Sequence, residues 1–154
     1  MFRIDNQNTP INLACLPPEK FFNWYENQMT SIDLENKPEL IDQITVKEDG
    51  SLISTYVEND SLKLKTKASL DAVQAQGALK YLEQDKNKKF YKELLQLTID
   101  GYTINMEYTS PRNQIVLEYL EDKLTVFSIR SRIDGTYLTY QNLVNKKQNF
   151  PEII

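Results

Sequence analysis

The sequence of 154 residues contains no histidine and a single cysteine, Cys15. Without histidine the chain cannot form a Ser-His-Asp or Cys-His nucleophile pair, a histidine-ligated zinc site or an imidazole proton shuttle. One cysteine excludes an intramolecular disulfide and gives no sign of an oxidising compartment. Chemistry therefore falls to Lys, Arg, Asp, Glu, Tyr, Ser or Thr, and lysine becomes a leading candidate for a covalent nucleophile.

Long apolar runs are also missing, so we expect no membrane-spanning segment and no signal peptide. The formal net charge of −4 gives no global attraction to nucleic acid or anionic lipid, although a local basic groove stays open. The length suits one domain with one core. We therefore expect a soluble, cytoplasmic, single-domain protein.

Glycine is sparse, and three of the four glycines follow an aspartate, at Gly50, Gly101 and Gly135. Asp-Gly pairs favour turns, because glycine adopts positive φ without steric strain. Alternation of apolar and polar residues predicts two short strands within residues 2–16 and further strands at 44–47, 52–57, 62–67, 102–109, 115–119 and 123–129. Helical spacing predicts helices over residues 19–25, 69–84, 87–97 and 140–144. The expected fold class is α+β with mainly antiparallel sheets and a few helices.

The same patterns assign faces to these elements. Ser69 is expected to cap its helix, whose core side would carry Leu70, Val73, Leu79 and Leu82. Strand 102–109 divides into an apolar face with Tyr102, Ile104, Met106 and Tyr108 and a polar face with Thr103, Asn105, Glu107 and Thr109. On strand 62–67, two leucines share one face, and the other face carries Lys63, Lys65 and Lys67.

The segment Lys47-Glu48-Asp49-Gly50 lies between two predicted strands. Its plain interpretation is a hairpin turn with a solvated lysine and glutamate. It also resembles the K-x-D-G signature of covalent nucleotidyltransferases, in which the lysine attacks the α-phosphate of a nucleotide and carries the nucleotidyl group as a phosphoamidate. Attack requires the neutral amine, which burial or neighbouring cations favour. Gly50 would let the backbone approach the nucleotide closely, and Asp49 would orient the turn.

Three further segments occur in order around this signature: EKFFN at residues 19–23, KTKAS at 65–69 and NMEYTSPRNQIVL at 105–117. Together with KEDGSL at 47–52, they resemble motifs Ia, I and III of the phage RNA ligase 1 family, the tRNA-repair ligases of T-even phages. The resemblance covers nearly the whole chain. It implies a partial covalent-nucleotidyltransferase fold, the adenylation domain of a ligase, over residues 1–154.

The resemblance also implies roles for individual residues. Lys47 would accept AMP from ATP in the presence of Mg²⁺, with Asp49 beside it as the second catalytic position. The implied nucleotide-binding positions are Lys20, Phe22, Glu48, Gly50, Lys67 and Glu107. Among them, Phe22 would shape the adenosine pocket, Glu107 would bind a ribose hydroxyl and Lys67 would hold phosphate or RNA. The partner would be RNA, either tRNA or other single-stranded ends; no metal ligand is assigned.

Each position also has an ordinary structural interpretation. Phe22 could be a core aromatic, and Glu107 and the lysines could be solvated residues of strands. The family's Ser-Arg-Pro before the lysine segment is replaced by Cys15-Leu16-Pro17, so its cationic contact is not expected. Motifs IV and V and the C-terminal RNA-specificity domain are expected to be absent. This leaves two hypotheses: an ATP-dependent RNA ligase adenylyltransferase, with a second chain as a possible source of the missing motifs, or a catalytically incompetent module that binds nucleotide, RNA or a partner. A DNA ligase or capping enzyme is a weaker third.

Overall fold

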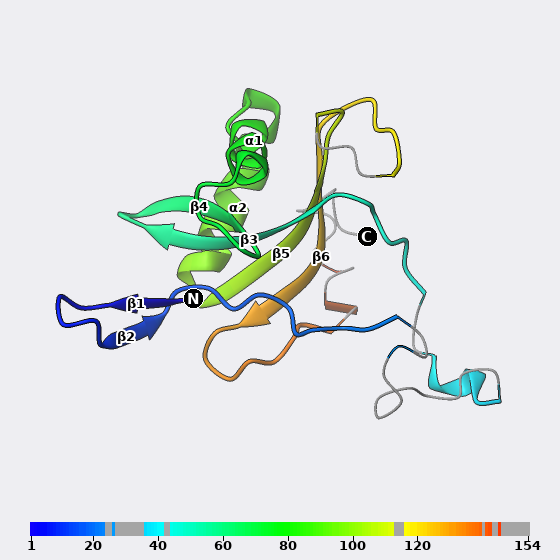
Figure 1. The fold of residues 1–154 in the computed structure, drawn as a ribbon, viewed down its shortest axis with the longest axis horizontal. Coiled ribbons are helices and arrows are strands. Elements are labelled where there is room, and N and C mark those ends of the chain that lie inside the picture. The colour runs from blue at the N-terminus through cyan, green and yellow to red at the C-terminus, as the bar shows by residue number, and fades with distance from the viewer. Residues whose placement is uncertain are drawn as a thin grey trace.

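The computed structural model describes residues 1–23, 26, 36–41, 44–112, 116–139, 141–142 and 145. Its centre is an antiparallel sheet of four strands in the order β4-β3-β5-β6 (Figure 1). The sheet consists of β3 (Ser51–Glu58), β4 (Ser61–Thr66), β5 (Tyr102–Thr109) and β6 (Lys123–Ser131). Strands β1 (Phe2–Ile4) and β2 (Pro10–Leu13) form a separate hairpin at the left of the view. The predicted α+β class with antiparallel sheets is confirmed.

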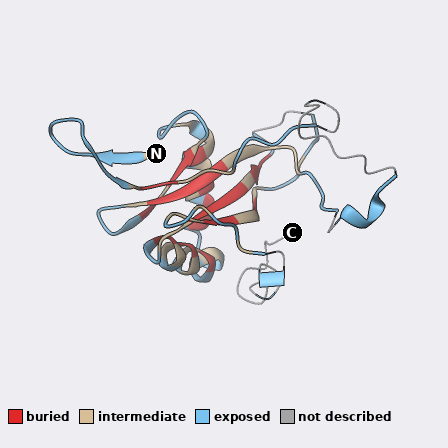
Figure 2. Ribbon diagram, turned by 90° about the horizontal axis from the view of Figure 1, so that it is seen from below, coloured by how far each residue is buried: buried red, intermediate tan, exposed pale blue. Residues whose placement is uncertain are grey.

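Helices α1 (Val73–Leu82) and α2 (Lys88–Ile99) pack on one face of the sheet and enclose the core. The 3-10 helix η2 (Asp85–Asn87) joins them, and η1 (Pro38–Leu40) lies away from the sheet. Figure 2 shows the buried residues concentrated in the central strands and on the inner sides of the helices. The predicted apolar face of β5 supplies this core, since Ile104, Met106 and Tyr108 are buried against Leu94 and Phe90. Full burial of each such side chain contributes about 1.5–3 kcal/mol.

The turn between β3 and β4, at Asn59-Asp60, lies between the strands predicted at residues 52–57 and 62–67. Both residues have positive φ, 49° and 57°. Two consecutive positive φ angles are the geometry of a type I′ hairpin turn, whose twist matches that of the flanking strands. Glu58 therefore pairs directly with Ser61.

The face of the sheet opposite the helices is polar and yet largely covered. The chain that follows β2 crosses it (Figure 1), and the Leu16 amide donates to Thr103 Oγ1 at 2.9 Å. Ser54 Oγ donates to Asn105 Oδ1 at 2.7 Å, and Asn105 Nδ2 donates to Ser128 Oγ at 3.2 Å. Thr103 and Asn105 are consequently buried. The polar face predicted for β5 is a hydrogen-bonded layer beneath a crossing segment, not a solvated surface.

The first helix begins later than predicted. Ser69 does not cap it, because its hydroxyl accepts the Asp71 amide in a local turn, and the helix starts at Val73 after Ala72. Leu70 and Val73, expected in the core, are 47% and 79% exposed. Leu82 is buried as predicted, and the rest of the buried side of α1 is formed by Ala75, Ala78 and Tyr81. The second helix agrees with its prediction, except that it extends to Ile99.

Three other predicted elements are wrong in their described parts. Residues 44–47 form no strand, and residues 19–23 form no helix, since the Glu19 amide is bound by the Tyr137 hydroxyl at 2.8 Å. Residues 116–119 form no strand either, because two of their amides are held by Asp49. Residues 24, 25, 115, 140, 143 and 144 of these and of the last predicted helix lie outside the described residues.

The lysine face of β4 is only partly correct. Lys65 is buried, with its amine donating to the carbonyl oxygen of Thr66, at 2.5 Å. Lys67 is exposed, as expected. Across the described residues, none of the helices is both long and apolar enough to cross a membrane.

Candidate functional site

A cavity of about 770 Å³ opens on the face of the sheet away from the helices. Its charged lining comes from Glu19, Lys20, Lys47, Glu48 and Glu107, and its apolar lining includes Phe21, Leu52 and Phe127. These side chains come from the segment after β2, the segment before β3, and strands β3, β5 and β6. A cavity with one apolar wall and a few convergent charged groups is the usual form of a small-molecule site.

Lys47 lies on the irregular segment that leads into β3. Its side chain is exposed and lines the cavity. Because residues 44–49 pair with no strand, the Asp49-Gly50 pair is not a hairpin turn, and that alternative is wrong. Positive φ occurs at Gly101 and Gly135, not at Gly50.

Gly50 is instead required by close packing. A Cβ atom at this position would lie 2.2 Å from the carbonyl oxygen of Tyr108 on β5. The same approach lets the Gly50 amide donate to Glu107 Oε1 at 3.0 Å. The backbone next to Lys47 is thereby fixed against the end of β5.

Glu107 lies half-buried where this segment meets β5, opposite Leu52 on β3. Burial raises the pKa of its carboxyl above the ordinary value of 4.5, while the Gly50 amide and the charge of Lys47 act in the opposite direction. One carboxylate oxygen is bound to Gly50, and the side chain also lines the cavity. The group is therefore placed to accept a hydrogen bond from a bound ligand.

Asp49 points away from the cavity lining. Its Oδ2 accepts the amides of Val116 and Leu117, at 2.7 and 3.1 Å. Its own amide donates to the hydroxyl of Tyr119 at 2.9 Å. Asp49 thus organises the loop between β5 and β6 around the lysine segment.

Glu48 lines the cavity and pairs with Lys123 of β6, with 3.2 Å between Oε1 and Nζ. The Tyr119 hydroxyl donates to its other oxygen at 3.4 Å. The lysine of this pair is 44% exposed, so the pair itself contributes little to stability. Its effect is to tie the segment that carries Lys47 to the edge strand β6.

The structure brings together Lys20, Lys47, Glu48, Gly50 and Glu107 around the cavity, and three predicted positions do not line it: Asp49, Phe22 and Lys67. Lys20 Nζ lies 4.5 Å from the centre of the Phe22 ring, a cation–π contact, but Phe22 does not line the cavity. Lys67 is exposed and also does not line it.

Strand β6 adds residues that the sequence patterns do not single out, namely Phe127 and Ser128. The register of β5 with β6 shifts between Asn105, paired with Ser128, and Met106, paired with Val126. Phe127 is the extra residue of this β-bulge, which redirects its side chain. Regular alternation cannot reveal such a residue, because the bulge breaks the alternation.

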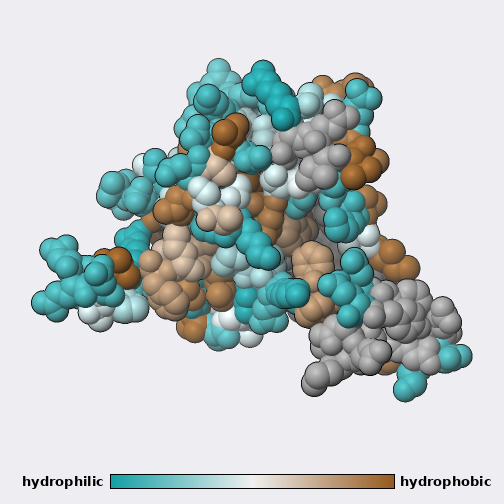
Figure 3. Space-filling model, in the orientation of Figure 1, coloured by the Kyte–Doolittle hydropathy of each residue, from teal (hydrophilic) through white to brown (hydrophobic). Residues whose placement is uncertain are grey.

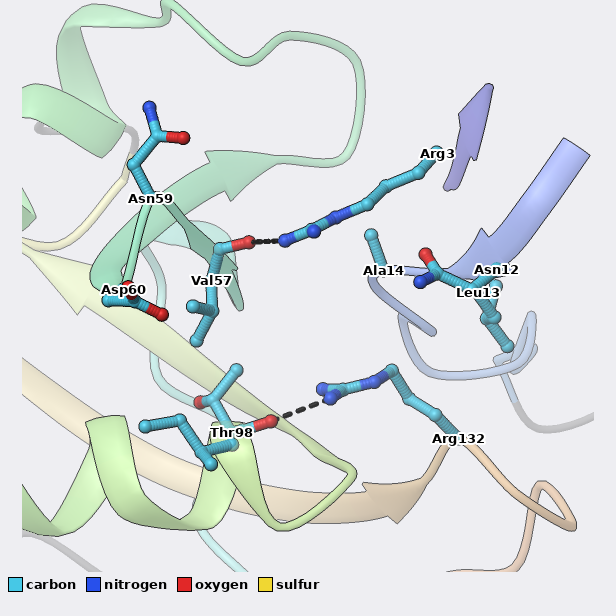
Figure 4. A pocket seen from close by; sticks show the side chains of 10 residues that line it. Arg3, Asn12, Leu13, Ala14, Val57, Asn59, Asp60, Thr98 and Arg132 are labelled. Atoms are coloured by element: carbon cyan, nitrogen blue, oxygen red, sulfur yellow. Dashed lines mark hydrogen bonds between the residues drawn. The ribbon is translucent and has the colours of Figure 1, made fainter. Parts of the chain in front are cut away.

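A second cavity, of about 480 Å³, lies at the other end of the sheet beside the β1–β2 hairpin (Figure 4). Its two arginines point at backbone carbonyls: Arg3 donates to Val57, and Arg132 donates to Thr98 at 2.6 Å. Burial lowers the pKa of Arg132, Cys15 acts in the opposite direction, and the charge of Arg3 adds a smaller lowering. These arginines hold the hairpin and the end of α2 in place. We therefore assign them a structural role and do not treat this cavity as the candidate site.

The surface is uneven in polarity. Figure 3 shows hydrophilic residues over the helices at the top and over the hairpin at the left. Hydrophobic residues gather at the upper right, where Figure 1 places the loop between β5 and β6. This loop exposes Val116 and Leu120 by 79% and 95%.

The fold is similar to that of solved RNA ligase structures. One is a Naegleria gruberi RNA ligase lysine-to-alanine mutant with ATP and Mn, at a TM-score of 0.57 and 18% identity over 99% of this chain and 46% of that one. Another structure of the Naegleria gruberi RNA ligase, with PPi, matches at a TM-score of 0.54 and 18% identity over 97% of this chain and 45% of that one. The chain thus spans less than half the length of these structures.

The sequence match identifies the family of this chain. A family model described as RNA ligase matches residues 1–151. The chain belongs to this RNA ligase family, as the order of its motifs leads one to expect.

Proposed function

We propose that this chain forms the nucleotide site of an ATP-dependent RNA ligase and that Lys47 is the residue that becomes adenylylated. The observation that carries the proposal is the cavity where Lys47, Lys20 and Glu107 converge beside an apolar wall. Family membership and the ATP named with a structure of the same fold support the choice of nucleotide.

The lining suits each part of ATP as a substrate. Leu52, Phe127 and Phe21 offer apolar surface to a base, and the two lysines offer positive charge to phosphates. The Glu107 carboxylate would accept a hydrogen bond from a ribose hydroxyl. The hydrogen bond from the Gly50 amide to Glu107 fixes the orientation of this carboxylate before ATP binds.

In the proposed step, the neutral amine of Lys47 attacks the α-phosphorus in line with the bridging oxygen toward the β-phosphorus. The P–N bond forms as that P–O bond breaks, pyrophosphate leaves with the electron pair, and the amine nitrogen releases one proton to water. Lys20 would offset negative charge that develops on the phosphates, an electrostatic contribution typical of phosphoryl transfer. Glu48 and Asp49 would act as positioning residues, because their carboxylates bind Lys123 and the loop amides.

A divalent cation such as Mg²⁺ belongs with this substrate, since a relative was solved with ATP and Mn. Among the described residues there is no group of three or more carboxylate or thiol side chains able to hold a metal ion. Mg²⁺ commonly uses one or two carboxylates and completes its shell with substrate phosphates and water. The ion would therefore enter with the triphosphate, and no protein cage is assigned to it.

Transfer of AMP from Lys47 to a 5′-phosphate would prepare an RNA end for joining to a 3′-hydroxyl. The substrate would be RNA with single-stranded ends, such as cleaved tRNA, in the cytoplasm. A second chain would be needed if the motifs that follow motif III in the family are supplied separately. These proposals rest on the family and not on the cavity.

Intact-mass spectrometry after incubation with ATP and Mg²⁺ tests the proposed step. We expect a mass increase of one AMP unit, its loss on adding pyrophosphate, and no increase for Lys47→Ala. Lys63→Ala, on the neighbouring strand, is the matched control and should form the adduct. Failure of the unmodified chain to gain AMP under any condition would refute autonomous adenylylation. If ATP nevertheless raises the melting temperature of the chain, the result would favour the alternative, a module that binds nucleotide without reacting with it.

A further inference from the structure

We propose that Arg130 is a positioning residue for the nucleotide cavity, holding the segment that carries Lys20 in place through Glu19 and Pro17. The inference rests on the proposed function, because it assigns Lys20 to the phosphates of ATP. It concerns a residue outside every motif in the sequence, on the outer strand of the sheet. Arg130 stands out because its nearly buried guanidinium makes several fixed contacts.

Three nitrogens of Arg130 are used, and each reaches a different part of the chain. Nε donates to the carbonyl of Gly135 at 2.9 Å, and Nη1 donates to the carbonyl of Pro17 at 2.8 Å. Nη2 binds Glu19 Oε1 at 2.7 Å. Since Glu19 directly precedes Lys20, two of the three contacts fix the segment that forms one wall of the cavity.

Tyr137 adds a second attachment to the same segment. Its hydroxyl accepts the Glu19 amide at 2.8 Å, and its ring lies 5.0 Å from the guanidinium carbon of Arg130. Tyr137 also lines the cavity, and its backbone bridges that of Arg130. The backbone and the side chain of Glu19 are therefore both held, from residues more than 100 positions away along the chain.

The chemistry requires arginine rather than any cation. Arg130 is 9% exposed, so its charge must be matched by fixed partners. A planar guanidinium offers donors in fixed directions and stacks on an aromatic ring, whereas a lysine ammonium is a flexible point charge. Lysine at this position would keep the charge but could not reach Gly135, Pro17 and Glu19 together.

The direct consequence is on the backbone of residues 16–21, and it can be measured without ATP. Hydrogen exchange followed by mass spectrometry should show faster exchange in this segment for Arg130→Lys and, at the Glu19 amide, for Tyr137→Phe. Arg132→Lys is the matched control, because that arginine also binds backbone carbonyls but at the distant cavity. Unchanged exchange at 16–21 in both variants would overturn the proposal even if the chain proves to be active. Melting curves verify that each variant is folded.

The second arm measures the rate of Lys47 adenylylation against ATP concentration. We expect KM for ATP to rise about tenfold in Arg130→Lys, the effect of losing one charge-assisted hydrogen bond. If Arg130 acts through Lys20, adding Lys20→Ala to Arg130→Lys should have less than the summed effect of the two single changes. Additive effects would overturn this role. An unmodified chain that forms no adduct would count against the proposed function, whereas the exchange result would still decide whether Arg130 holds the segment.

Discussion

Replacing Gly50 by alanine tests whether the close packing beside Lys47 is essential to the fold and to the proposed reaction. The added Cβ would lie 2.2 Å from the carbonyl oxygen of Tyr108 and 3.0 Å from Thr109 Cγ2. Carbon–oxygen contacts in proteins close to about 3.3 Å, so the two backbones must separate by about 1 Å. The obstacle is the backbone of a paired strand, which cannot rotate aside as a side chain can.

Both stability and chemistry should respond to that displacement. Overpacking and a weakened bond from the Gly50 amide to Glu107 together destabilise by roughly 2–4 kcal/mol. For a chain of this size, this lowers the melting temperature by roughly 4–16 °C. A shift of about 1 Å beside Lys47, the proposed nucleophile, should lower the rate of its adenylylation about 10²-fold. Denaturant melts and the initial rate of AMP incorporation measure the two effects separately.

Gly77→Ala is the matched control. A Cβ there would meet only the tip of the Tyr108 side chain, 2.9 Å away, and alanine favours the helix interior by about 1 kcal/mol over glycine. We expect a stability change within about 1 kcal/mol and near-normal AMP incorporation for this variant. If Gly50→Ala melts and reacts like the unmodified chain, close packing at Gly50 does not position the site.

Two further predictions concern buried polar groups. Glu107→Gln should raise the melting temperature at pH 7, because an acid whose pKa rises on folding destabilises the fold above that pKa. The gain in melting temperature should vanish as the pH falls toward 4.5. The same substitution should weaken the proposed binding of ATP. A pH-independent difference in thermal melts would contradict this reasoning. Thr55→Val should cost about 1–3 kcal/mol in urea melts, because the Ile104 amide loses its acceptor, whereas Thr109→Val should be neutral or stabilising because that hydroxyl has no partner among the described residues. Equal effects of the two changes would refute the distinction.

Local patterning predicts much of the fold. Strand β5 and helix α2 follow directly from period-2 and helical spacing, and the Asn59-Asp60 turn follows from its residue types. These elements are determined by contacts close in sequence or by one uniform face against the core. The prediction is weakest for residues 19–23 and 44–49, which are held by hydrogen bonds to partners more than 50 residues away.

The residues of the candidate site also fall into those that the sequence predicts and those that it does not. Lys47, Glu107 and Lys20 are identified by motif residues, and the structure places all three around one cavity. Asp49, Phe22 and Lys67 do not line it, since a motif fixes neighbours in sequence and not the direction of each side chain. Phe127 and Arg130 are invisible to patterning, because one depends on a bulge and the other on carbonyls of a crossing segment.

Strand β5 shows why one element serves both the core and the site. Its odd-numbered side chains face the crossing segment and the cavity, while Ile104 and Met106 pack under the helices. A charged group such as Glu107 can therefore be held rigidly at the end of a strand whose opposite face is a packed core. The price of this arrangement is a desolvated carboxylate, which the Gly50 amide offsets in part. A ligand that donates a hydrogen bond to this carboxylate would offset more of the desolvation, so the cost of the carboxylate to folding and its contribution to the proposed binding would have the same origin.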